Sequence, residues 1–232
     1  MKLFGGISIK DNAKTRAVQS MNGQLRQLKI ITTNITNFGV VGYQRDIALK
    51  TSFAEYIGAH AVEPIKDTKV GRLRTTTNPL DLALEDKGYF QVEHQNGVRL
   101  TRDGRLSIDK EGFLRNVNGN RFLGADGEPL QLKTIPTDLK DLKVEPDGNM
   151  YIYNRALSQK DYMGRIGIAA EDGTPTTEVK VIQGYLEESN VNLQQEFFDV
   201  IPLRRNFEAN KRVMIVLSEN SQKLLQNLGK PN

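Results

Sequence analysis

A narrow apolar stripe along residues 189–228 constrains the fold of this chain more than any other feature. Apolar residues recur every seven positions at Val200, Phe207, Met214 and Leu228, and Ser221 is the one polar interruption of that series. The stripe is completed by Leu193, Phe197, Leu203, Leu217 and Leu224, and its period is near 3.5 residues. This period is typical of a helix that packs lengthwise against another helix. We therefore expect a long C-terminal helix with a helical partner.

A matching stripe lies near the N-terminus, in a predicted helix over residues 12–36. Its members are Met21, Leu25, Leu28, Ile31 and Ile35. Gly23 costs a helix interior about 1 kcal/mol relative to alanine, so we expect this helix to be weak in isolation. The two stripes together, without Leu203, form the predicted subunit interface.

The predicted ends of the two helices depend on Asn, Gly and Pro. Residues 34–37 and Gly39 should end the first helix, with Gly39 as a left-handed cap, and a turn at residues 40–43 should follow. Asn192 is a plausible N-cap of the second helix. Pro202 removes one backbone hydrogen bond and should kink that helix.

The chain between the stripes has the sequence pattern of short strands divided by turns. Six Asn-Gly or Asp-Gly pairs mark turns in it, and they end at Gly97, Gly104, Gly119, Gly127, Gly148 and Gly173. Such spacing predicts an antiparallel barrel or sandwich. The expected fold class is α+β: N- and C-terminal helices packed as a coiled coil, plus an antiparallel β-rich central domain. We divide the chain into an N-terminal helix and turn (1–43), an extended and partly stranded connector (44–77), the β-rich domain (78–182) and the C-terminal helix (183–232).

Composition narrows the range of function classes. The 232 residues include no Cys and two His, which excludes a disulfide framework and makes a zinc site a poor prediction. The opening residues lack the apolar segment of a conventional signal peptide, and the longest apolar run, residues 213–217, is too short to cross a membrane. We expect no membrane insertion and no cleaved signal peptide.

The sequence contains no recognisable catalytic arrangement. Asp81 and Glu85 would share one face of a strand, but no base or nucleophile motif accompanies them. Gly39 and Gly42 are not followed by the Lys-Ser/Thr of a phosphate loop. We therefore predict no enzyme activity, no metal and no cofactor.

Charge leaves a second function open. Residues 1–36 hold six Lys or Arg against one Asp, a net charge of +5, whereas the rest of the chain is close to neutral. A basic arm of this kind could bind nucleic acid or an anionic surface. The charges are spread along the predicted helix, as on a solvated face, so a structural protein without a nucleic-acid partner is the favoured alternative.

Several short motifs occur in a fixed order along the chain. They are TNITN at 33–37, GY at 42–43, NPLDLAL at 78–84, KGYFQV at 87–92, LTRDG at 100–104, GFL at 112–114, FLG at 122–124, QGYLEESNVN at 183–192 and RNFEANK at 205–211. This ordered set resembles the family of bacterial flagellar basal-body rod and hook axial proteins. The length of the chain is most similar to that of a short protein of the middle or distal rod.

The resemblance implies properties that periodicity alone does not. It implies a structural subunit that polymerises helically, through its terminal helices, into the axial tube of the basal body. It implies partners that are identical and related axial subunits, together with the flagellar type III export apparatus. The expected location is the periplasm-spanning rod, reached by export without a cleaved signal peptide.

Overall fold

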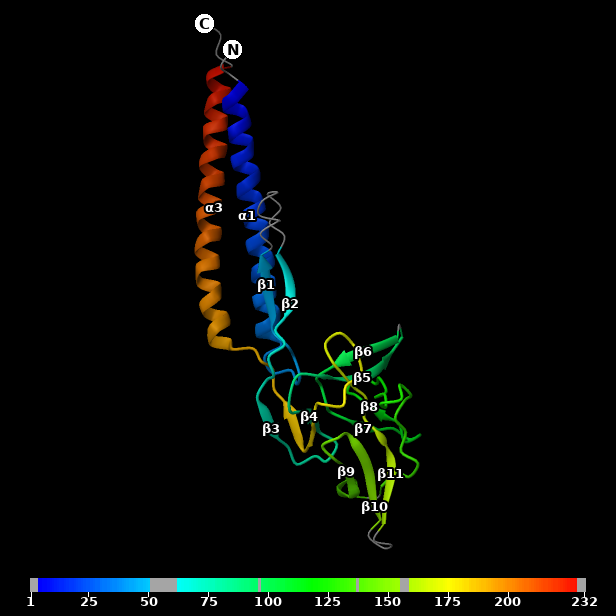
Figure 1. Ribbon diagram of the computed structural model, residues 1–232. Helices are drawn as coiled ribbons and strands as arrows, with labels where there is room; N and C mark the ends of the chain where they lie inside the picture. The colour runs from blue at the N-terminus through cyan, green and yellow to red at the C-terminus, as the bar shows by residue number, and fades with distance from the viewer. Residues whose placement is uncertain (1–3, 51–61, 96, 137, 155–158, 229–232) are drawn as a thin grey trace. The chain divides into compact units, whose positions relative to one another are not determined.

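Two long helices lie near the two ends of the chain in the computed structural model (Figure 1). The structure describes residues 4–50, 62–95, 97–136, 138–154 and 159–228. Helix α1 spans Phe4–Thr36 and helix α3 spans Leu193–Leu228. Strands fill the sequence between them, so the predicted α+β class with a β-rich middle is confirmed.

Helix α1 begins eight residues before the predicted start at residue 12. Gly5 and Gly6 are poor helix formers, but tertiary context can override such propensity. The end of α3 runs beside the start of α1 (Figure 1). The predicted weak point, Gly23, is buried within α1.

The left-handed glycine after α1 is Gly42, with a φ of 66°, and the prediction of Gly39 was wrong. The Val40 N–H donates to the Asn37 carbonyl at 3.0 Å. A tight turn therefore follows the helix, and the left-handed residue comes after that turn. A β-carbon at Gly42 would lie 2.5 Å from the carbonyl carbon of Arg102. Only glycine fits this approach without a shift of the backbone.

Asn192 caps α3, as predicted. Its Oδ1 atom accepts the backbone N–H groups of Gln194 and Gln195 at 3.0 and 3.2 Å. The helix then continues through Pro202. Proline lacks the N–H that would bond the carbonyl four residues earlier, yet α3 is one helix from Leu193 to Leu228.

The chain forms two compact units. The helical unit contains residues 1–36, 46–67 and 192–232. Besides α1 and α3 it has the hairpin of β1 (Asp46–Lys50) and β2 (Val62–Lys66), which pair antiparallel. The β unit contains residues 37–45 and 68–191. The four-part division of the sequence stays a prediction.

The β unit is built from small antiparallel sheets. Its strands are β3 (Leu73–Thr75), β4 (Leu82–Leu84), β5 (Tyr89–His94), β6 (Gly97–Thr101), β7 (Ser107–Ile108), β8 (Leu114–Arg115), β9 (Leu142–Val144), β10 (Asn149–Asn154), β11 (Gln159–Arg165), β12 (Ile168–Ala169), β13 (Val181–Gln183) and β14 (Tyr185–Glu187), with a 3-10 turn η1 (Leu139–Asp141). The three-stranded sheets have the orders β11-β10-β9 and β12-β5-β6, and the others are pairs. Within the described residues we find neither the closed barrel nor the pair of large stacked sheets that the turns suggested.

One type of turn recurs in the β unit. In five hairpins a glycine with a φ between 82° and 86° donates its N–H to the carbonyl three residues earlier; these are Gly112, Gly119, Gly127, Gly148 and Gly173. This is the hairpin built on a type I turn with a left-handed fourth residue. Asp103-Gly104 is different, because Gly104 has no positive φ and a β-carbon there would lie 1.9 Å from the Leu82 carbonyl oxygen. Asn96 lies outside the described residues.

The β unit has one continuous apolar core, drawn from residues 80–181. Phe90 and Phe122 are fully buried at its centre, with ring centroids 6.0 Å apart in an edge-to-face contact. Aromatic and aliphatic packing of this extent is what allows a domain to fold on its own.

A buried ion pair joins distant segments of the β unit. Arg102 and Glu187 are each 3% exposed, and the guanidinium contacts the carboxylate at 2.5 Å and 2.7 Å. Arg102 also donates to the carbonyls of Asp86 and Gly88, while Glu187 accepts the Gly71 N–H at 2.9 Å. The pair is therefore hydrogen-bonded on both sides, which a buried charge requires.

Candidate assembly surface

Helices α1 and α3 lie side by side and run antiparallel (Figure 1). Lys14 Nζ donates to Ser221 Oγ at 3.0 Å near one end of the pair, and Asn210 Nδ2 donates to Ser20 Oγ at 3.0 Å further along. Residues early in α1 thus meet residues late in α3.

The predicted residues of α1 divide into two groups. Met21, Ile31 and Ile35 are half-buried, whereas Leu25 and Leu28 are 49% and 39% exposed. Leu25 and Leu28 therefore leave apolar surface in contact with solvent when the chain is alone. Burial of one such side chain is worth about 1.5–3 kcal/mol, which only a partner could provide.

The predicted residues of α3 divide in the same way. Leu193, Val200, Phe207, Met214 and Leu217 are half-buried, and Phe197 is 57% exposed. The side chains of Leu224 and Leu228 lie outside the described ones. Leu203, at the middle of the stripe, is buried.

Sequence reasoning missed further apolar residues that α3 exposes. They are Phe198, Ile201, Val213, Ile215, Val216 and Leu225. Periodicity could have found part of this set, because Ile201 follows Phe198 by three residues and Phe197 by four, and both spacings bring helical side chains together.

A polar node that sequence reasoning also missed holds the helical unit together. Asn34 of α1 is fully buried, and its amide both donates to the Asp46 carbonyl at 2.9 Å and accepts the Asp46 N–H at 2.8 Å. Asn34 Nδ2 also lies 3.4 Å from Oε1 of Glu196, which is buried in α3. Lys66 pairs with Asp46 at 2.7 Å. One side chain thus connects α1 to both α3 and β1.

Two apolar grooves run along the helix pair. The first is lined by Leu25, Leu28, Val200, Leu203 and Phe207, together with Gln24 and Arg204. The second is lined by Val18, Met21, Leu25, Met214 and Ile215, together with Asn22, Lys211 and Ser218. Leu25 belongs to both, so we treat them as one feature and call it the side groove.

The described part of the chain contains no group of three His, Cys, Asp or Glu side chains that could hold a metal ion. Within the same residues, no helix is long and apolar enough to cross a membrane. His94 is exposed, and His60 lies outside the described residues.

Comparison with known proteins identifies the class. The family described as the flagellar hook protein FlgE/F/G D1 domain matches residues 83–152, and the family described as the flagellar basal body rod FlgEFG protein C-terminal region matches residues 182–227. The chain belongs to the family of flagellar basal-body rod and hook proteins.

Relatives that align over most of the chain are rod proteins. The flagellar basal-body rod protein FlgF of Caulobacter vibrioides is 29% identical, with 96% of this chain and all of that protein aligned. The protein of the same name from Mesorhizobium japonicum is 28% identical over 88% of this chain and 92% of its own length. The rod protein FlgG of Bacillus subtilis is 25% identical over 96% of this chain and 97% of its own length.

Proposed function

We propose that this chain is a structural subunit of the flagellar basal-body rod, and that it polymerises helically through its terminal helices into the axial tube. The observation that carries the proposal is the exposed apolar surface of α1 and α3, exemplified by Leu25 and Phe197, in a chain whose full-length relatives are rod proteins. An open helical polymer needs interfaces between different patches on successive copies. The two helices supply such patches.

Several finer features belong to the same proposal. The α1–α3 pair packs as a coiled coil, and its partners are identical and related axial subunits. The chain is exported by the flagellar type III apparatus without a cleaved signal peptide, and it resides in the periplasm-spanning rod. The predicted period near 3.5 supports coiled-coil packing, and the rod and hook relatives support axial neighbours. We assign the chain no catalytic role.

The proposal is tested in the bacterium that encodes the chain, after deletion of its own copy. A plasmid copy should restore motility, and the chain should be present in isolated basal bodies. The variant Leu28→Asp should be absent from basal bodies, while the β unit keeps its circular dichroism signature. Presence of the variant at the wild-type level would refute assembly through the helices.

The alternative, a nucleic-acid or anionic-surface binder, makes a different prediction. It would use the basic residues of α1, of which Arg16, Arg26 and Lys29 are exposed. Binding to generic DNA would then weaken steeply as salt rises. A structural subunit should show no binding that changes with salt in this way.

A further inference from the structure

One side chain of the β unit is hydrogen-bonded close to several of the points at which the chain passes between the two units. These points are the peptide bonds 36–37, 45–46, 67–68 and 191–192. The Oδ1 atom of Asn190 accepts the Arg45 N–H at 2.6 Å, and its Nδ2 atom donates to the Lys69 carbonyl at 2.8 Å. Asn190, Arg45 and Lys69 each lie within two residues of a different one of these points, and all three belong to the β unit.

The backbone around Asn190 adds to the same link. The Asn190 N–H donates to the Tyr43 carbonyl at 3.3 Å, and the Gly42 N–H donates to the Glu187 carbonyl at 2.8 Å. Val191, the last residue of the β unit, is buried. The folded β unit therefore holds the segment that follows α1 beside the segment that precedes α3. The residues that make these bonds form what we call the crossing clamp: Gly42, Tyr43, Arg45, Lys69, Glu187 and Asn190.

The crossing clamp shortens the connection between the two long helices. Along the sequence, residues 37–192 separate α1 from α3. Through the clamp, the connection consists of residues 37–43 and 190–192. Because the entropic cost of closing a flexible loop grows with its length, a folded β unit with a closed clamp brings the two helices together at a lower cost.

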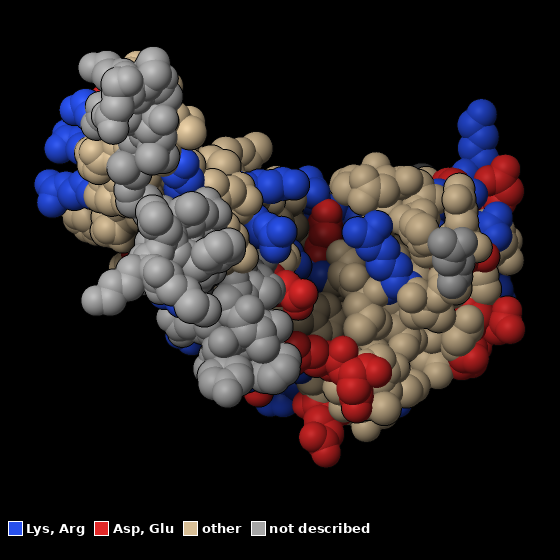
Figure 2. Space-filling view, turned by 90° about the horizontal axis from the view of Figure 1, so that it is seen from above, with Lys and Arg blue, Asp and Glu red and all other residues tan. Residues whose placement is uncertain are grey.

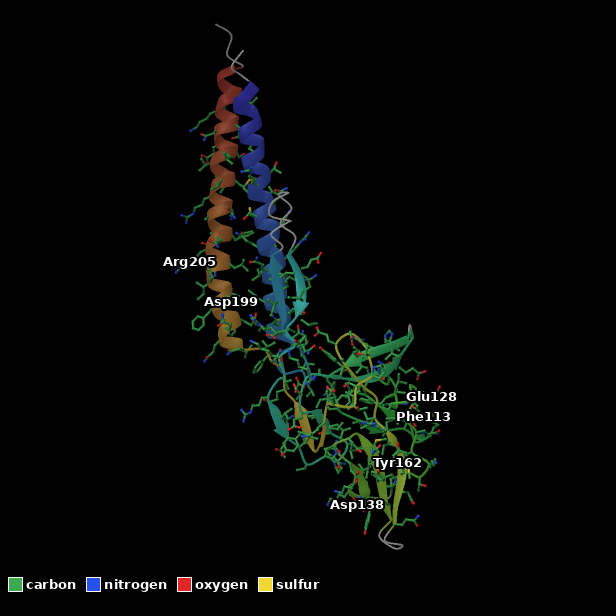
Figure 3. The ribbon with its side chains drawn as sticks, in the orientation of Figure 1. Phe113, Glu128, Asp138, Tyr162, Asp199 and Arg205 are labelled. Atoms are coloured by element: carbon green, nitrogen blue, oxygen red, sulfur yellow. The ribbon has the colours of Figure 1, made fainter. Side chains whose placement is uncertain are left out.

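The helix pair has few other sources of stability in a single chain. Among the described side chains of the helical unit, the buried apolar residues are Ala17, Ile30 and Leu203. Helix α1 contains five Lys or Arg and one Asp, and α3 contains five Lys or Arg and four Asp or Glu. Figure 2 shows Lys and Arg side chains along the edge of the helical unit, at the left of the view, and Figure 3 labels Asp199 and Arg205 on α3. Both helices thus have an excess of positive charge, which opposes their pairing.

We propose that Asn190 is a positioning residue, through which the folded β unit holds the end of α1 and the start of α3 together and so sets the register in which the two helices pair. The segment after α1 and the segment before α3 meet at this side chain, so the helices are aligned from that end. The inference goes beyond the proposed function, because it concerns a single chain and does not depend on which neighbours that chain has.

The test measures helix pairing in the purified full-length chain. The natural chain has no Cys, so Ser20→Cys combined with Asn210→Cys introduces two thiols at positions where Asn210 Nδ2 lies 3.0 Å from Ser20 Oγ. The rate at which oxidised glutathione converts them into a disulfide reports how often the helices meet in register. Adding Asn190→Ala should lower this rate about fivefold, the equivalent of one net hydrogen bond. Amide hydrogen exchange in β5, followed in the same samples, should not change.

Two matched variants separate positioning from stability. Asn190→Asp keeps an oxygen that can accept the Arg45 N–H but loses the donor to Lys69, and should keep the rate within about twofold of the parent value. Asn116→Ala removes another Asn whose Oδ1 atom accepts two backbone N–H groups, in this case within one turn of the β unit. This variant should leave the rate unaltered, because Asn116 is not part of the crossing clamp.

Three results would overturn the proposal. The first is a parental rate of disulfide formation for Asn190→Ala. The second is a drop of the same size for Asn116→Ala or Asn190→Asp. The third is faster amide exchange in β5 for Asn190→Ala, since the residue would then support the core of the β unit instead of positioning the helices. None of these results bears on the proposed function, whose own failure would appear as absence of the chain from isolated basal bodies.

Discussion

The two units of this chain bury their apolar residues to very different extents. In the β unit, one core of buried side chains includes Phe90, Phe122 and Met150. In the helical unit, the buried apolar residues among the described side chains are Ala17, Ile30 and Leu203. Since apolar burial is the main favourable term in folding, the β unit can be stable alone, whereas the helical unit has most of its potential stabilisation still available.

This contrast explains how one chain can be both a folded protein and a building block. The β unit adds a buried ion pair and repeated tight turns to its core, so its structure is specified internally. The structure of the helical unit depends on the Asn192 cap and on the hydrogen bonds of Asn34. Its exposed apolar residues remain available for contacts with other subunits. Mutations should accordingly separate into those that unfold the monomer and those that prevent assembly.

The largest expected effect comes from a matched pair of phenylalanine truncations. Phe90→Ala empties the centre of the β core and should lower the free energy of unfolding by about 4 kcal/mol. Phe197→Ala removes an exposed ring of α3 and should change the stability of the purified chain by less than about 1 kcal/mol, while it lowers incorporation into basal bodies. Urea unfolding followed by circular dichroism measures both. Similar stability losses for the two variants would remove the contrast between the units.

The next effect concerns the buried ion pair. Glu187→Gln leaves Arg102 charged and buried without its carboxylate, and should cost the β unit about 3 kcal/mol. The matched control is Glu85→Gln, because the Glu85–Lys180 pair at 3.5 Å is well exposed and should contribute under about 1 kcal/mol. If both variants unfold at the same urea concentration, the pair does not hold the β unit together.

Asn34 tests whether a polar contact partly compensates for the small core of the helical unit. Asn34→Ala removes the amide that bonds both backbone groups of Asp46, and should destabilise the helical unit by about 2 kcal/mol. Thermal loss of helix, followed by far-ultraviolet circular dichroism, is the measurement. Asn22→Ala, at an exposed site of α1, should melt like the wild type. A normal melt for Asn34→Ala would indicate that helix packing alone is sufficient.

The smallest expected effect is an acid dependence confined to the β unit. The hydroxyl of Thr174 and then its backbone N–H donate to Asp172, and these bonds hold the pKa of the Asp172 carboxyl below its ordinary value. A lowered folded-state pKa stabilises the protein above the unfolded value, and that contribution is lost as the pH falls through the folded value. Asp172→Asn should therefore make unfolding of the β unit slightly less sensitive to acid. Superimposable acid-unfolding curves would contradict this.

Local chemistry made much of the fold predictable. The Asp-Gly and Asn-Gly pairs marked Gly97, Gly119, Gly127, Gly148 and Gly173, each of which has a positive φ. The same rule failed at Gly104, since its absent side chain makes room for the Leu82 carbonyl, a contact that no local pattern encodes.

Long-range contacts were not predictable from one sequence. Arg102 and Glu187 lie in motifs that the resemblance used, but 85 residues separate them and nothing local indicates their pairing. Asn34 was interpreted as a helix terminator because Asn competes for backbone bonds, and its burial against Asp46 depends on how the chain returns. The apolar stripes indicated which residues could be exposed or paired, yet only the structure separated Leu25 and Leu28 from Met21.

The most direct test of the account uses the absence of cysteine from the natural chain. Single cysteines are introduced by Leu25→Cys or Phe197→Cys in the helices, and by Val117→Cys, which is 57% exposed in the β unit, as the control. In the purified chain all three should react with a maleimide at similar rates. In isolated basal bodies the two helix positions should be protected about tenfold or more, because neighbouring subunits cover them, while the control stays reactive. Helix cysteines that react as fast in basal bodies as in the purified chain would contradict the claim that assembly buries the terminal helices.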